Sequence, residues 1–95
     1  MSAYIFARID VSDMDAYSTY ASQTAGIAAK FGGKALVKGG RFEQVEGEGR
    51  SRHVLISFPD MDAARAFYNS EEYQAILPIA LSHSTRDLVI VDGAD

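Results

Sequence analysis

Two segments of this 95-residue chain carry apolar side chains at consecutive positions, which is the feature that most restricts its fold. Successive side chains of a β-strand point to opposite faces, so such strands must be covered on both sides. In the first segment, Tyr4 and Phe6 occupy one face and Ile5, Ala7 and Ile9 occupy the other. In the second segment, Leu88 and Ile90 occupy one face and Val89 and Val91 the other. We expect strands at 3–9 and 87–91 whose two faces are both buried.

A helix is predicted directly after the first strand. Ser12-Asp13 supplies residues that cap helix N-termini, and Gly32-Gly33 supplies residues that end helices. Between them apolar residues recur at steps of three and four, which is typical of an amphipathic helix. These residues are Tyr17, Tyr20, Ala21, Thr24, Ile27, Ala28 and Phe31.

The middle of the chain predicts a β-hairpin. A strand runs from Lys34 to about Glu46, bent at Gly39-Gly40, and a turn at 47–49 leads to a strand over 52–58. Glycine inside a strand marks a bulge, a bend or a place where something closely approaches the backbone. We interpret the glycine pair as a bulge that curves the sheet.

Two helical pieces are predicted between the hairpin and the last strand. Pro59-Asp60 ends the third strand and caps a short helix, and Asn69-Ser70 interrupts it and caps a second one. Proline lacks a backbone N–H, so we expect Pro78 to kink or divide the second piece. His83 is placed in a loop before the last strand.

The element order is therefore βαββαβ, the ferredoxin-like α+β arrangement of an antiparallel sheet with helices on one face. We expect a single domain over residues 1–95, with the first and last strands as the central pair. Helices on one side leave about half a dozen apolar side chains on the other side in water, which would cost roughly 10 kcal/mol. The sequence therefore predicts a homodimer whose subunits cover each other's open sheet face.

Composition excludes several classes of function. Nine basic residues against thirteen acidic ones give a net charge of −4, which argues against nucleic-acid binding. There is no cysteine, no secretory signal and no apolar run of 18 residues, so we expect a cytoplasmic protein without membrane association. The two histidines lack metal-ligand spacing, and no dinucleotide or phosphate-loop motif occurs, so no metal and no cofactor are expected.

The best polar cluster lies on the hairpin strands. Lys38 or Arg41 would hold an anionic group of a substrate, and His53 would act as general base, the role that histidine most often has in proton transfer. Three tyrosines on the helices would line the binding pocket: Tyr20, Tyr68 and Tyr73. The alternative remains open that the charged residues are solvated, that His53 is an ordinary strand residue and that the tyrosines belong to the core.

An ordered set of motifs covering nearly the whole chain resembles the family called domain of unknown function 1330. The matching residues are Tyr17 and Tyr20, Gly32-Gly33, Leu36-Val37-Lys38-Gly39-Gly40, Phe58-Pro59-Asp60, Ala63, Phe67-Tyr68-Asn69-Ser70-Glu71-Glu72-Tyr73 and Val91-Asp92-Gly93. The resemblance implies a dimeric α+β barrel, in which two ferredoxin-like sheets pack together. Relatives in that superfamily include cofactor-free monooxygenases, lactone isomerases, haem enzymes and stress-related proteins, which commonly use a cleft between sheet and helices.

The chain departs from the family pattern at two positions. Family members often carry arginine where this chain has Ala80, and arginine where it has Lys38, which keeps the charge but loses the planar two-pronged donor. Two hypotheses remain: a homodimer that binds a small organic molecule between sheet and helices and transforms it without a cofactor, or a non-catalytic homodimeric binding or stress-related module.

Overall fold

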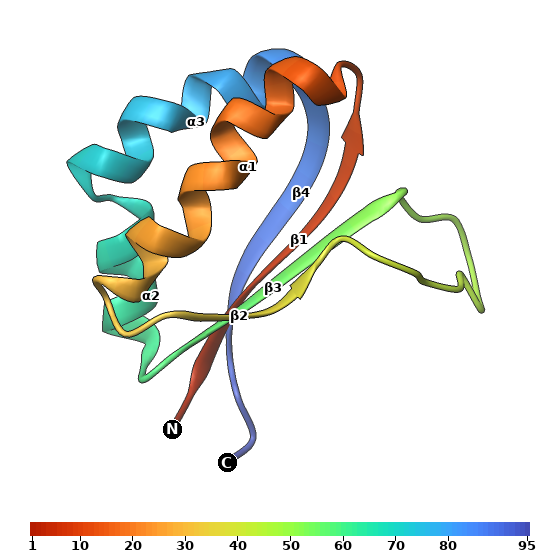
Figure 1. Cartoon of the computed structure of the whole chain (residues 1–95). Helices are drawn as coiled ribbons and strands as arrows, with labels where there is room; N and C mark the ends of the chain where they lie inside the picture. Colours follow the sequence, from red (N-terminus) through yellow and green to blue (C-terminus); the bar gives the residue numbers. More distant parts are fainter.

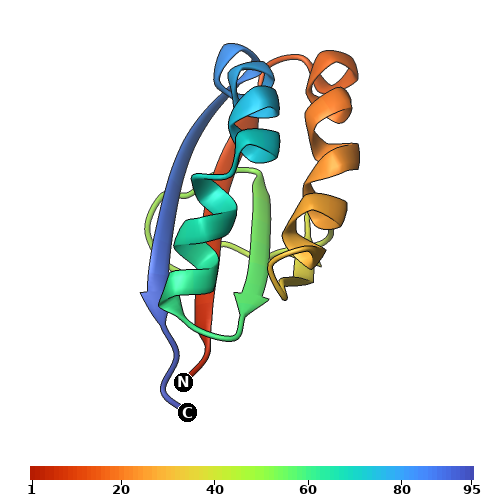
Figure 2. The ribbon, with the colours of Figure 1, turned by 90° about the vertical axis from the view of Figure 1, so that its left-hand side faces the viewer.

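The computed structural model describes residues 1–95 and contains one antiparallel sheet covered by helices on one face (Figure 1). The elements are β1 (Ala3–Val11), α1 (Met14–Ala29), β2 (Lys34–Lys38), β3 (Arg52–Phe58), α2 (Met61–Tyr68), α3 (Glu71–His83) and β4 (Ser84–Asp92). All three helices lie on the same side of the sheet, and they are in front of it in the view turned by 90° (Figure 2). The predicted α+β ferredoxin-like arrangement is confirmed.

The strand order is β2-β3-β1-β4, with every neighbouring pair antiparallel. The expectation that the first and last strands form the central pair is therefore wrong, because β1 and β3 are central and β4 is an edge strand. β2 follows β1 in the chain through α1, but the two strands are not neighbours in the sheet, because β3 lies between them. β4 pairs along the free edge of β1, from Val11 opposite Ser84 to Ala3 opposite Asp92.

The predicted caps are all present. The side chains of Asp13, Asp60 and Ser70 accept hydrogen bonds from backbone N–H groups in the first turns of α1, α2 and α3, over 3.2, 2.8 and 3.2 Å. The expected division at Pro78 is wrong, because α3 runs through it to His83, whose place is thus helix and not loop. Burial of Tyr73, Ile76, Leu77 and Ala80 along this helix offsets the hydrogen bond that proline cannot make.

The predicted long, bent second strand is also wrong, because β2 ends at Lys38. Gly39 and Gly40 both have positive φ angles, +76° and +94°, which turn the chain away from the sheet instead of bulging within a strand. The register shift lies earlier, between Ala35 and Val37. Residues 39–51 form a long loop that extends away from the body of the molecule (Figure 1).

The core lies between the sheet and the helices. β1 presents alternate residues to it, and Ile56 and Phe58 continue this layer on β3. The buried residues are Ala3, Ile5, Ala7, Ile9, Tyr17, Tyr20, Ile27, Ala28, Ile56, Phe58, Ala64, Phe67, Tyr73, Ile76, Leu77 and Ala80. None is charged, so every ionic side chain lies at the margin of this layer or outside it.

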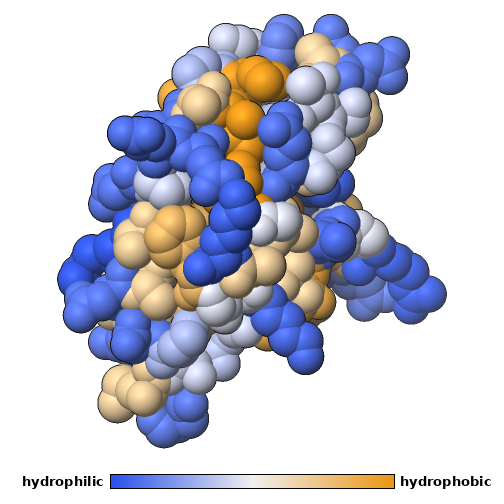
Figure 3. Space-filling model, turned by 60° about the vertical axis from the view of Figure 1, so that its left-hand side comes forward, coloured by the Kyte–Doolittle hydropathy of each residue, from blue (hydrophilic) through white to orange (hydrophobic).

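The opposite face of the sheet is apolar and uncovered. Phe6, Val37, Val89 and Val91 are 36, 37, 52 and 47 % exposed on it. A shallow depression on this face is lined by Tyr4, Phe6, Val37, His53, Leu55 and Val91. By contrast, mostly hydrophilic side chains cover the helix side, where apolar atoms show in a strip between them (Figure 3). No helix has the length and apolar character needed to cross a membrane.

Candidate functional site

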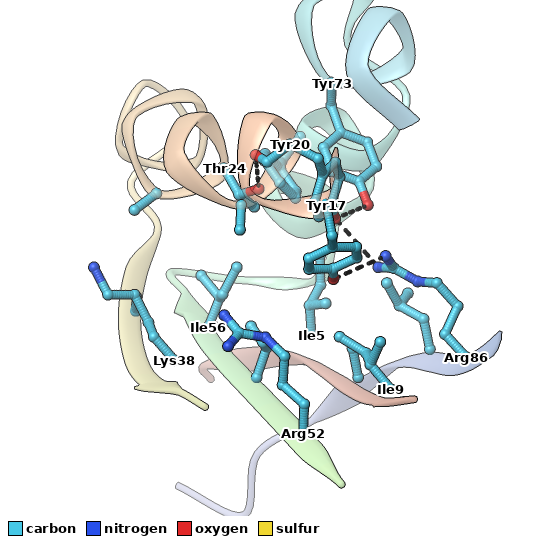
Figure 4. A pocket seen from close by; sticks show the side chains of 17 residues that line it. Ile5, Ile9, Tyr17, Tyr20, Thr24, Lys38, Arg52, Ile56, Tyr73 and Arg86 are labelled. Atoms are coloured by element: carbon cyan, nitrogen blue, oxygen red, sulfur yellow. Dashed lines mark hydrogen bonds between the residues drawn. The ribbon is translucent and has the colours of Figure 1, made fainter. Parts of the chain in front are cut away.

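A cavity of about 40 Å³ lies between the helix-facing side of the sheet and α1. Thirteen of its seventeen lining residues are hydrophobic if the three tyrosines, which also carry polar hydroxyls, are included; others are Ile5, Ile9, Ile56, Phe67 and Leu88. The polar lining residues come from two sides, as Figure 4 shows: the sheet supplies the cations, and the helices supply hydroxyl groups. These residues are Lys38, Arg52, Arg86, Tyr17, Tyr20, Tyr73 and Thr24.

Two arginines reach the cavity from one row of the sheet. Ile9 of β1 is paired with Arg52 of β3 on one side and with Arg86 of β4 on the other. Residues directly opposite one another in antiparallel strands share a face, so both guanidinium groups lie on the helix side with Ile9. Lys38 joins them because it pairs with Val54, two residues after Arg52.

Arg86 is held by the tyrosines of α1. Its Nη2 donates a hydrogen bond to the Tyr20 hydroxyl over 3.2 Å, and its Nη1 donates one to the Tyr17 hydroxyl over 3.4 Å. Its guanidinium also lies 5.3 Å from the centre of the Tyr20 ring, within cation–π range. The Tyr20 and Tyr73 hydroxyls are themselves hydrogen-bonded at 2.7 Å, which links β4 to α1 and α3.

The side chain of Arg52 makes no hydrogen bond and no ion pair. Its Nε is buried without a partner, and its guanidinium lies 5.9 Å from the centre of the Tyr17 ring. On the other side it lies against Gly39, where an added Cβ would meet Nη1 at 2.5 Å. The Arg52 guanidinium therefore packs against an aromatic ring and a glycine, and none of its N–H groups is hydrogen-bonded to the protein. Here the glycine does admit a close approach to the backbone.

Burial determines the protonation of the phenols. It raises the pKa of the Tyr17 hydroxyl, and it raises the pKa of Tyr73 further still, with a contribution from the neighbouring Tyr20. Burial alone would lower the pKa of the Arg86 guanidinium, but the hydroxyls of Tyr20 and Tyr73 outweigh it and the pKa is raised. At neutral pH the cavity therefore combines neutral phenols with cationic side chains.

The structure brings together only part of the residues proposed from the sequence. Lys38, Tyr20 and Tyr73 line the cavity. Tyr68 packs against Tyr73, with ring centres 5.3 Å apart, but does not line it. Arg41 lies exposed in the loop after β2.

His53 lies on the other side of the sheet from Lys38, so the proposed convergence of these two residues is wrong. Its ring contacts Phe42 and Phe6 on the open face, with ring centres 4.8 and 6.4 Å apart. The reason is strand alternation, because His53 follows Arg52 directly and must point the opposite way. In its row of the sheet it pairs with Arg8, which forms an ion pair with Asp87 at 3.6 Å.

Arg52 and Arg86 were missed by the reasoning from sequence, although alternation contains the information for both. Val54, Ile56 and Phe58 alternate along the predicted strand 52–58 and therefore share a face, and Arg52 belongs to the same series two residues earlier. Arg86 was lost because the last strand was expected to begin at 87, whereas β4 begins at Ser84. Ala80, where family members often carry arginine, is fully buried in this chain.

The structure contains no group of three or more histidine, cysteine, aspartate or glutamate side chains that could hold a metal ion. The five ion pairs all lie outside the cavity and involve none of its lining residues. The site therefore offers cationic and hydroxyl donors, apolar walls and no carboxylate.

Comparisons with solved structures place this fold among known proteins. RPA0582, a protein of unknown function from Rhodopseudomonas palustris, is 12 % identical with a TM-score of 0.81 over 99 % of this chain and 83 % of that one. A dimeric ferredoxin-like protein of unknown function from Jannaschia sp. CCS1 is 14 % identical with a TM-score of 0.80, covering 98 and 100 %. These identities are low, so the likeness shows the fold alone.

A third similar structure is a mutant of SnoaB, a cofactor-independent oxygenase from Streptomyces nogalater. It is 14 % identical with a TM-score of 0.71 over 99 % of this chain and 94 % of that one. A search of curated proteins finds no significant match to the sequence. A family model does match, over residues 2–94. The chain therefore belongs to the family described as domain of unknown function DUF1330.

Proposed function

We propose that this protein is a homodimer that binds a small organic molecule bearing an anionic group in the cavity between sheet and helices. One observation carries the proposal: three cationic residues and no acidic residue line an otherwise apolar cavity. A guanidinium taken partly out of water without a counter-charge is costly. A bound anion would supply the missing charge.

The dimer is proposed from the open sheet face. Exposed valines and Phe6 form an apolar surface there, and monomers seldom keep a large surface of that kind in water. A second copy would cover it most simply, because the same patch on both subunits is self-complementary in a twofold pair. The description of the fold neighbour from Jannaschia as dimeric supports this assembly.

Cofactor-free transformation of the bound molecule is the second candidate. It is favoured by the Arg52 guanidinium beside a largely apolar cavity, which would stabilise an enolate or a similar anion. The description of SnoaB as a cofactor-independent oxygenase adds support by analogy of fold. Binding is the better-supported function, because His53 lies across the sheet and the buried phenols hold their protons too tightly to act as bases near neutral pH. The cytoplasmic location remains a prediction.

The test is a ligand-observed NMR screen of small carboxylates, phenols and lactones against the wild type and two variants of α1. Ala25 lines the cavity, so Ala25→Leu should fill it and abolish binding. Ala29 is exposed and outside the lining, so Ala29→Leu is the matched control and should bind normally. Absence of any ligand, or equal binding by both variants, would refute the proposed site. Incubating each ligand that binds under air tests the second candidate, because transformation requires new product signals.

A further inference from the structure

The two arginines of the cavity have different roles, and the difference is visible in their contacts. Arg86 donates to two tyrosine hydroxyls and lies against the Tyr20 ring, so its donors and its charge are engaged within the protein. The guanidinium of Arg52 donates no hydrogen bond within the protein, and its Nε is buried. In Figure 4 the Arg86 head is joined to the tyrosines by dashed lines, whereas the Arg52 head has none.

The Arg52 guanidinium is nevertheless packed on two sides. Gly39 lies against Nη1, and the N–H of Gly39 is held by the carbonyl of His53 over 2.7 Å, which fixes the loop beside the guanidinium. The Tyr17 ring lies on its other side. A donor group that is already oriented loses little conformational freedom when it binds an acceptor. Arg52 thus has the properties of an anion anchor in a site that is already formed.

The size of the cavity limits what this anchor can hold. A volume of about 40 Å³ is enough for roughly three water molecules, or for a ligand of about four to six non-hydrogen atoms. Its apolar walls suit a short hydrocarbon body. Lys38, exposed on β2, adds a second positive charge at the margin of the cavity.

We propose that the cavity selects a short-chain monocarboxylate, whose two oxygens are bound by Arg52 and whose apolar body lies against Ile5, Ile56 and Leu88. The inference rests on the proposed function and narrows it to one class of ligand. The planar fork of a guanidinium matches the two oxygens of a carboxylate. Arg86, the second guanidinium, is already hydrogen-bonded to the tyrosines, so Arg52 is the one guanidinium left to bind a carboxylate.

The experiment compares propionate with propionamide, its neutral analogue of almost the same shape, by isothermal titration calorimetry in a buffer free of carboxylates. We expect propionate to bind at least about tenfold more tightly than the amide, because hydrogen bonds to a charged group are the stronger ones. Octanoate, which exceeds the cavity, should bind more weakly than propionate.

Two variants separate a local contact from general charge. Arg52→Met and Arg41→Met each remove one positive charge, but only Arg52 lines the cavity. We expect Arg52→Met to weaken propionate binding at least about tenfold and Arg41→Met to leave it within about twofold, since exposed charges are screened. Arg52→Lys should recover only part of the affinity, because it restores the charge but not the fork.

The outcomes distinguish the inference from the proposed function. Equal affinity for propionate and propionamide, or equal effects of the two methionine variants, would overturn the choice of a carboxylate while leaving a small-molecule site in place. Binding of other molecules in the NMR screen without propionate binding would do the same. Failure of every molecule to bind would overturn both.

Discussion

Arg52 and Arg86 occupy the same row of the sheet, yet replacing each with methionine should change stability in opposite directions. Methionine keeps much of the apolar stem and removes the charged head. At position 52 the head contributes no hydrogen bond and leaves a buried N–H unsatisfied. At position 86 the head bonds two tyrosine hydroxyls. A residue kept for ligand binding at a cost in stability should behave as Arg52 does.

The magnitudes follow from these contacts. A buried unsatisfied donor costs about 1–3 kcal/mol, and the cation–π contact with Tyr17 that would be lost contributes about 0.5–1 kcal/mol. Arg52→Met should therefore raise the free energy of unfolding by about 1 kcal/mol, which is about 4–8 °C in Tm for a domain of this size. Arg86→Met loses one good and one long charge-assisted hydrogen bond and should lower it by about 2 kcal/mol.

The assay is thermal and urea unfolding followed by circular dichroism, without carboxylate buffers and at one fixed protein concentration, because the Tm of the proposed dimer would depend on concentration. Arg41→Met, an exposed loop variant, is the control and should stay within about 0.5 kcal/mol of the wild type. If Arg52→Met lowers the free energy of unfolding by 1 kcal/mol or more, Arg52 is a structural residue and its role as an unused anion anchor is refuted.

Three further predictions concern other parts of the molecule. Val89→Asp on the open face should shift the protein to monomer in analytical ultracentrifugation, whereas Met14→Asp, at a similarly exposed apolar residue on α1, should not; a dimer that survives Val89→Asp places the interface elsewhere. Gly39→Ala should destabilise more than Gly40→Ala, because both glycines have positive φ but only at Gly39 must the Arg52 side chain move aside; adding Arg52→Met should remove the excess, and additive effects would count against the contact. Tyr17 and Tyr73 have raised pKa values in the folded state, so the unfolded chain loses protons first and the free energy of unfolding should fall as the pH rises above about 10; a flat profile up to pH 11 would contradict their burial.

Much of the fold could be predicted because local chemistry and tertiary packing agree in this chain. Asp13, Asp60 and Ser70 cap the helices they precede, and each lies at the start of an apolar helical pattern. The failures occur where tertiary contacts decide. Pro78 stays within α3 because one face of that helix is buried against the core, and β2 ends at Lys38 because two positive φ angles follow.

The candidate site was harder to predict because it depends on which face of a strand each residue occupies. His53 and Arg41 were predicted as site residues from their side-chain chemistry, whereas Arg52 and Arg86 are the residues that line the cavity. The type of a residue does not tell which face of the sheet its side chain occupies. That face follows from alternation along the strand, and alternation can be applied only to residues known to belong to the strand. An expected start at 87 instead of Ser84 was enough to omit Arg86.

The same alternation ties the cavity to the proposed dimer interface. Arg52 and His53 are neighbours in sequence, and so are Arg86 and Asp87, yet the first of each pair faces the cavity and the second faces the opposite side. One row of the sheet thus carries Arg52, Ile9 and Arg86 toward the cavity, and the adjacent row carries His53, Arg8 and Asp87 toward the open face. A one-residue insertion within β3 would exchange these assignments on that strand and damage both surfaces together, whereas the same insertion in the loop 39–51 leaves every row in register.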